Sequence, residues 1–106
     1  MGNVCRSPVP KPDMLDISIE LKMQAKMIDK QSLILKREAE KNVYCAKKET
    51  DPDRQVMYAE NAIRAKTESV RMMKFGVKVL SVSKTIESAA RTMEVSETLM
   101  KSSGLI

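Results

Sequence analysis

The 106-residue chain offers few side chains that could do chemistry. It has no histidine, so the commonest general base and a frequent metal ligand are absent. Cys45 has no histidine to activate it, and a lone cysteine in a helical stretch is typical of a small apolar packing residue. No glycine-rich loop is present to hold a phosphate. The closely spaced acids are typical of a solvated surface: Glu38 with Glu40, and Glu94 with Glu97. The sequence therefore indicates a protein that is not an enzyme and uses no metal or other cofactor.

Basic residues are the next chemical feature, because the net charge is +5. Between Arg64 and Lys84 only Glu68 is acidic. Four basic residues of this region fall within about 80° of one another around a helix, which favours contact with anionic lipid headgroups. The alternative is a solvated face with pairs such as Glu60 with Arg64. Nucleic acid is disfavoured, since aromatic stacking residues and a recognisable binding motif are lacking. The candidate membrane-binding residues are Arg64, Arg71, Lys74 and Lys78.

The opening MGNVCRS is a candidate lipidation site. Gly2 lies where myristoylation occurs, although Arg6 takes the place of the usual serine or threonine. Cys5 would accept a second acyl chain, and one chain alone anchors only marginally. Three of the four prolines lie in residues 1–12, which predicts a flexible arm. The alternative for this segment is a disordered tail without a lipid.

Two long helices must position the remaining residues. From Asp13 to Glu49 there is no proline or glycine, and the apolar residues advance by threes and fours, which predicts a helix over 13–49. ETDPDRQ predicts a tight reversal, with Pro52 suited to the first turn of a second helix over 52–102. The predicted fold is all-α: residues 13–106 form a long antiparallel hairpin. At about 1.5 Å per residue the helices span about 55 and 75 Å, so the second extends past the first near residue 88.

The helices carry more apolar faces than a lone hairpin can cover. One stripe of the second helix, from Val56 through Ile63, Val70 and Val77 to Leu80, is predicted to face the first helix. Other apolar residues lie away from that contact and predict packing by a third helix, a trimeric coiled coil or a homodimer. The candidate polymer interface is Met23, Met27, Ile34, Phe75, Val79, Val82, Ile86 and Met93.

Gly76 interrupts the second helix with a residue that costs about 1 kcal/mol relative to alanine. It is a candidate hinge, or the site of a close contact.

Two further patterns concern the compartment. The two cysteines form no disulfide framework, which favours a reducing compartment. No apolar run approaches about 18 residues and no signal peptide is evident, so we expect a cytoplasmic protein with at most peripheral membrane contact.

The run YAENAIR, followed by a basic residue and then an R-M pair, resembles the second helix of the ESCRT-III family. The flanking sequence is similar too: LKMQAKMIDKQS resembles the first helix, REAEKNVYCAKKE its end, and KVLSVSKTIESAARTM a later stretch that ends in T-M. The resemblance covers roughly residues 20–93, the amino-terminal helical core, and is greatest to the charged multivesicular body proteins of type 1. It implies a subunit whose second helix extends on opening. Such a subunit polymerises on anionic membranes, alone or with other ESCRT-III subunits, and takes part in membrane remodelling, scission and endosomal sorting.

Two features depart from the family pattern. The opening MGNVC is more similar to the subunit type that carries a myristoyl group. The later helices, the acidic carboxy-terminal region and the motif that recruits the hexameric ATPase have no counterpart, so we expect no ATPase recruitment by this chain. It is either the core of a longer protein or a naturally short member. Two other hypotheses remain: a truncated regulator that caps or stalls ESCRT-III filaments, and a generic coiled-coil adaptor.

Overall fold

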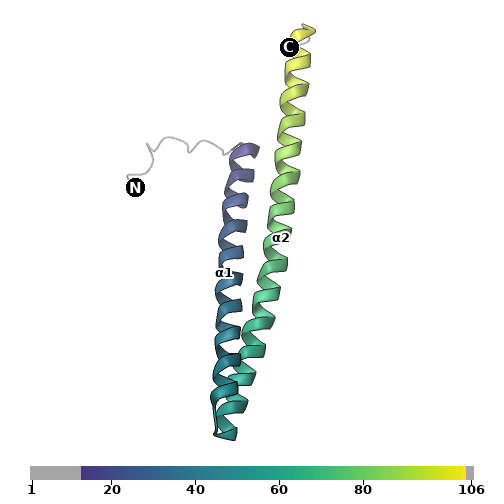
Figure 1. The fold of residues 1–106 in the computed structure, drawn as a ribbon. Coiled ribbons are helices and arrows are strands. Elements are labelled where there is room, and N and C mark those ends of the chain that lie inside the picture. Colours follow the sequence, from purple (N-terminus) through teal and green to yellow (C-terminus); the bar gives the residue numbers. More distant parts are fainter. Residues whose placement is uncertain (1–12, 105–106) are drawn as a thin grey trace, which may run out of the picture.

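Two long helices form an antiparallel hairpin in the computed structural model, which describes residues 13–104 (Figure 1). Helix α1 runs over Met14–Lys48 and helix α2 over Pro52–Ser102. These bounds agree with the predicted helices to within one residue at each end. The predicted all-α hairpin with a longer second helix is confirmed. The amino-terminal arm, with Gly2 and Cys5, lies outside the described residues.

Local chemistry sets the helix ends. The Asp13 carboxylate accepts a hydrogen bond from the Asp16 N–H at 2.8 Å, which caps α1. Pro52 opens α2 because its missing N–H is not needed in the first turn. Beyond the end of α2, Gly104 adopts a φ of 77°, a left-handed conformation that glycine reaches at little cost. Across the turn, the Gln55 side chain donates to the Ala46 carbonyl at 3.0 Å.

The two helices meet along a line of small residues, which we call the small-residue seam. The buried small residues of α1 recur every seven positions, as do those of α2 apart from Ala65, so that one narrow stripe faces the partner helix along the contact. Larger half-buried residues such as Leu21, Ile28 and Met72 flank this stripe. Small side chains let the two backbones approach closely. The seam consists of Ser18, Ala25, Ser32 and Ala39 on α1, and Ala62, Ser69, Gly76 and Ser83 on α2.

Two hydrogen bonds cross the small-residue seam. The Ser69 hydroxyl donates to the Ser32 carbonyl at 2.7 Å, and the Ser83 hydroxyl donates to the Ser18 carbonyl at 2.6 Å. The other two buried hydroxyls donate within α1, from Ser32 to the Asp29 carbonyl and from Ser18 to the Leu15 carbonyl. Within residues 13–104 no buried side-chain polar atom lacks a partner, so these serines are accommodated without an unpaired donor.

The side of α2 that faces α1 differs from the prediction. The expected stripe of larger residues is only partly buried: Val56, Ile63 and Val77 are each more than half accessible, whereas Val70 and Leu80 are half-buried. The helices turn the small residues inward because a close approach brings serine donors within reach of carbonyls on the other helix. On α1 the apolar residues that advance by threes and fours lie mostly inward: Ala25 and Ala39 are buried, whereas Val43 is exposed.

Gly76 lies at a point of close packing. A Cβ atom at this position would come within 3.2 Å of the Ile28 Cγ2 atom and 3.7 Å of the Ala25 carbonyl oxygen. Helix α2 continues through Gly76 without a break. The close-contact alternative therefore accounts for this glycine, and the hinge stays a prediction.

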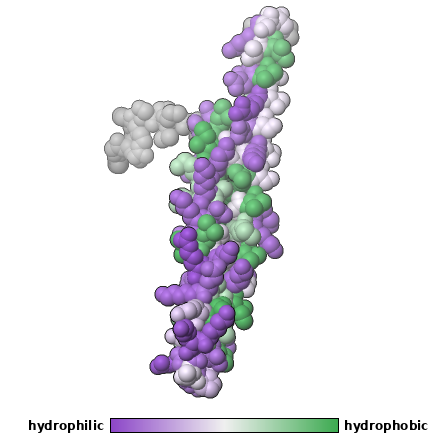
Figure 2. Space-filling model, in the orientation of Figure 1, coloured by the Kyte–Doolittle hydropathy of each residue, from purple (hydrophilic) through white to green (hydrophobic). Residues whose placement is uncertain are grey.

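Helix α2 extends well past the start of α1 (Figure 1). Ala89 and Ala90 are the last half-buried residues, and every described residue from Arg91 onward is exposed. We call Arg91–Ser102 the overhang. Figure 2 shows hydrophobic surface continuing onto it, and Met93, Val95 and Leu99 contribute to its exposed apolar area. The predicted loss of a partner near residue 88 is confirmed.

Candidate functional site

The predicted basic stripe lies on the outer side of α2. Arg71 and Lys78 follow Arg64 at intervals of seven, so all three lie on the side of α2 opposite the small-residue seam, with Lys74 close beside them. The Arg71 guanidinium forms an ion pair with Glu68 at 3.1 Å, and the Arg64 guanidinium donates to the Asn61 side chain at 3.0 Å. The solvated-face alternative in the sequence analysis had paired Arg64 with Glu60, and the structure pairs it with Asn61.

Solvent exposure leaves this stripe free to meet an anionic surface. All four basic residues are exposed. Within residues 13–104 neither Lys74 nor Lys78 forms an ion pair. The arrangement can contact lipid phosphates, but only one helix contributes to it.

The candidate polymer-interface residues divide into two groups. Val79 and Ile86 are half-buried and flank the small-residue seam, so they belong largely to the contact between α1 and α2. The other candidates are exposed and face away from the seam, which leaves them free to contact another molecule: Met23, Met27, Ile34, Phe75, Val82 and Met93.

The structure also brings together a surface that the sequence analysis missed, which we call the groove face. It contains two grooves between α1 and α2, of about 490 Å³ and about 380 Å³. Small seam residues form their floors, and lysines from both helices stand at their edges. The first groove is lined by Lys36, Ala39, Glu40, Val43, Ala62, Ile63, Lys66 and Thr67. The second is lined by Lys22, Ala25, Lys26, Asp29, Met73, Gly76, Val77, Leu80 and Lys84.

Both grooves open on the same side of the hairpin. Lys22 and Lys36, like Ile63 and Val77, are separated by fourteen residues, which is two repeats of the seam. Equivalent positions in a seven-residue repeat lie on one side of a helix pair. The repeat of exposed apolar residues next to lysines was visible in the sequence, but the partner of each residue across the seam was not.

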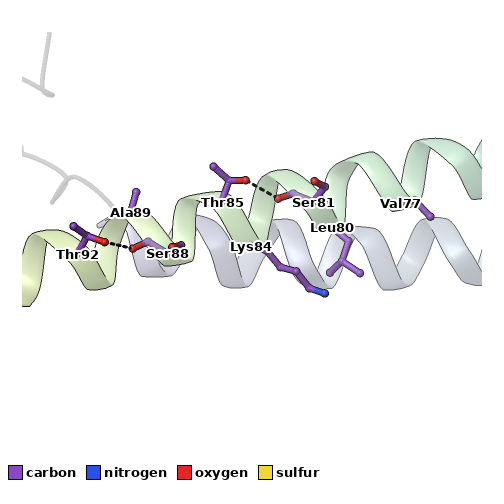
Figure 3. A pocket seen from close by; sticks show the side chains of 8 residues that line it. All are labelled: Val77, Leu80, Ser81, Lys84, Thr85, Ser88, Ala89 and Thr92. Carbon is purple, nitrogen blue, oxygen red and sulfur yellow. Dashed lines mark hydrogen bonds between the residues drawn. The ribbon is translucent and has the colours of Figure 1, made fainter.

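A third hollow, of about 670 Å³, follows the outside of α2 (Figure 3). Its eight lining residues all belong to one helix, and Figure 3 shows Leu80 and Lys84 pointing to the opposite side from Thr85 and Ala89. The Thr85 hydroxyl donates to the Ser81 carbonyl at 3.1 Å. The Thr92 hydroxyl likewise donates to the Ser88 carbonyl, so both threonine hydroxyls bind within their own helix.

An ion-pair cluster joins the start of α1 to α2. The Glu87 carboxylate accepts from the Arg91 guanidinium at 2.8 Å and from the Lys22 ammonium at 3.4 Å. These two cations, Arg91 foremost, lower the pKa of Glu87. The bond from Lys22 crosses between the helices, so it joins them near the end of the hairpin opposite the turn.

The fold and surfaces define an elongated two-helix hairpin with basic faces. Within residues 13–104, neither helix has a stretch long and apolar enough to cross a lipid bilayer. Among these residues there is no group of three or more histidine, cysteine, aspartate or glutamate side chains that could hold a metal ion. Comparison with protein-family models, with curated proteins and with solved structures found no match.

Proposed function

We propose that this chain is an ESCRT-III-like subunit that polymerises on anionic membranes and takes part in membrane remodelling, scission and endosomal sorting. The overhang is the observation that carries the proposal. A helix whose last turns expose Met93, Val95 and Leu99 has apolar surface that its own partner helix cannot cover. A neighbouring subunit, of this chain or of a related one, would bury it.

Charge and shape support the membrane part of the proposal. The chain carries a net charge of +5, and the stripe of Arg64, Arg71, Lys74 and Lys78 is exposed along one rigid helix. Basic residues near an anionic bilayer contribute about 1 kcal/mol each. A rod with such a stripe can lie flat on a membrane and leave its apolar sides free for neighbouring subunits. The resemblance of YAENAIR and its flanks to the family supports the same assignment.

Sedimentation with vesicles tests this function. The purified chain is mixed with vesicles that contain about a third phosphatidylserine, or none, and the pellet is imaged by negative-stain electron microscopy. We expect filaments on the anionic vesicles only, with binding that weakens as salt rises and screens the charges. The proposal is wrong if the chain pellets equally with anionic and neutral vesicles, or if it remains monomeric on anionic vesicles.

A matched pair of variants tests the basic stripe. Arg71→Glu with Lys78→Glu reverses two charges seven residues apart on α2. Lys30→Glu with Arg37→Glu makes the same charge change, at the same spacing, on the exposed surface of α1. The α2 pair should lose most of the vesicle binding, and the α1 pair should keep more of it. Equal losses would mean that net charge, and not the stripe, determines binding.

A further inference from the structure

The groove face has the shape of a helix-binding surface. Its floor is made of alanine and glycine because the small-residue seam brings the backbones together, and larger residues form the walls. Ile63 and Val77 on these walls are 67% and 64% exposed, which is high for branched apolar side chains. A concave apolar strip between two helices is matched by the convex apolar side of a third helix. A flat bilayer surface matches it less well.

The length of the groove face matches one ordinary helix. Its lining residues on α1 extend from Lys22 to Val43, which is about 32 Å along the helix axis. A partner helix of about 20 residues spans that distance. Both grooves lie on one line, so the same partner helix can fill them in succession.

Charge indicates which helix fits. Five lysines line the two grooves, against Asp29 and Glu40, so the groove face is basic on both edges. Lys22 forms an ion pair with Glu87 at 3.4 Å, and the other four lysines form no ion pair within the described residues. A helix with Asp or Glu on both flanks of its apolar side would pair with these lysines. A second copy pairing through the same face would place lysines against lysines, which disfavours it.

From these observations we infer that the groove face binds a single amphipathic helix of another polypeptide, with leucine-sized residues on one side and acidic residues on both flanks of that side. This interaction takes place in solution and does not depend on assembly on membranes. The exposed residues proposed for the polymer, such as Met27 and Phe75, lie outside the grooves.

The probe is a synthetic peptide of 21 residues, capped at both ends and labelled for fluorescence anisotropy. Leucines at the i, i+3, i+4 and i+7 positions form its apolar side, glutamates flank that side, and alanines fill the rest. A second peptide carries lysine in place of each glutamate. Without vesicles present, the full chain should bind the glutamate peptide saturably and more weakly at higher salt. It should bind the lysine peptide at least tenfold more weakly.

Two valines of α2 provide a matched test of the location. Val77→Ser removes a wall of the groove face, whereas Val82→Ser makes the same change at a residue 51% exposed on the other side of the helix. Val77→Ser should weaken peptide binding about tenfold, as expected for losing a buried valine contact. Val82→Ser should change it less than about twofold. Circular dichroism checks that both variants keep the helical content of the parent chain.

A second pair tests the lysines. Lys66→Glu with Lys84→Glu reverses charges on the groove edges, and Lys74→Glu with Lys78→Glu makes the same change on the outer side of α2. The groove pair should weaken binding of the glutamate peptide by at least tenfold more than the outer pair at low salt. It should also allow the lysine peptide to bind.

Several outcomes would overturn this inference. They are the absence of saturable binding up to about 1 mM peptide, equal effects of the two valine variants, and equal binding of the two peptides. If Val77→Ser changes self-association or vesicle pelleting but leaves peptide binding intact, the groove face contacts other copies or lipid, and our assignment is wrong. Because the assay contains no vesicles, failure of the membrane function leaves its result interpretable.

Discussion

At the scale of single residues, the buried serines determine how the helices meet. The hydroxyls of Ser69 and Ser83 reach across the contact and donate to carbonyls of α1, at 2.7 and 2.6 Å. A serine is small enough to keep the backbones close and polar enough to make the contact directional. The interface therefore combines tight packing with a defined position of one helix along the other.

Ser83→Ala should destabilise the hairpin by about 1 kcal/mol, because it removes a buried hydrogen bond without creating a large cavity. Thr85→Ala is the control: its hydroxyl is exposed and donates within α2 to the Ser81 carbonyl. Urea unfolding followed by circular dichroism measures both. We expect the Thr85 variant to stay within about 0.5 kcal/mol of the parent. Equal effects of the two substitutions would show that the inter-helix bond adds no stability.

These same residues show why part of the contact could not be predicted. Leu21, Ile28 and Leu35 form a hydrophobic line that predicts the inner side of α1 correctly. On α2 the innermost residues are serine, alanine and glycine, whereas Ile63 and Val77 of the predicted stripe lie beside the contact, on the exposed walls of the groove face. The pattern of large apolar residues on α2 therefore predicts a face that is rotated from the observed contact. The seven-residue spacing of the small residues was the signal, and its meaning depends on which residues pair across the seam.

At the scale of the elements, the helix ends followed from local chemistry. ETDPDRQ and its Pro52 predicted where α1 ends and α2 begins because caps and breakers act within one turn. The cluster of Lys22, Glu87 and Arg91 could not be predicted in this way. Its cross-helix bond joins residues far apart in sequence, so it requires the pairing of the two helices to be known first.

The Glu87 cluster predicts a pH dependence. Its pKa is lowered from an ordinary value of 4.5 in the folded chain, so the carboxylate contributes stability above that value and loses it as the pH falls through the lowered pKa. Glu87→Gln should therefore lower the urea midpoint at pH 7 and have a smaller effect at pH 3. The contribution is modest because the Glu87 side chain is 26% exposed and its partners are more so.

Glu94→Gln provides the control for this experiment. Glu94 is exposed on the overhang and forms no ion pair within residues 13–104. Its substitution should change the midpoint little at either pH. A Glu87→Gln variant with the same difference from the parent at pH 7 and pH 3 would contradict the electrostatic explanation.

At the scale of the whole molecule, the unequal lengths of the helices dominate. About a dozen residues at the end of α2 have no partner in α1, and their apolar side chains meet solvent. This mismatch was predictable, because it depends only on the positions of the turn and of the helix ends. What covers the overhang was not predictable, since both a copy of the chain and a different helix would satisfy the same apolar surface.

Met93→Ser tests the role of the overhang in assembly. Met93 is 55% exposed, so the substitution should leave the stability of the hairpin nearly unchanged while raising the concentration needed for assembly on anionic vesicles about tenfold. Met57→Ser makes the same change at a residue 49% exposed near the turn and should have a smaller effect. Sedimentation across a concentration series measures both. Equal shifts would mean that assembly does not use the overhang.

The seven-residue repeat also leaves a second alignment of the two helices within reach. Suppose that α2 slid by one repeat, about 10 Å. Ser18 would then lie opposite Ala90 and Ser32 opposite Gly76, so each small residue of α1 would still face a small residue of α2. The Ser83 hydroxyl would then donate to the carbonyl of Ala25 instead of that of Ser18. The short connection between Lys48 and Pro52 disfavours this alignment, since it has no spare length, and sliding would also break the ion pair between Lys22 and Glu87. The turn therefore acts together with the interface to select one of two alignments of the small-residue seam, and one inserted repeat of flexible residues there should let the hairpin populate the second.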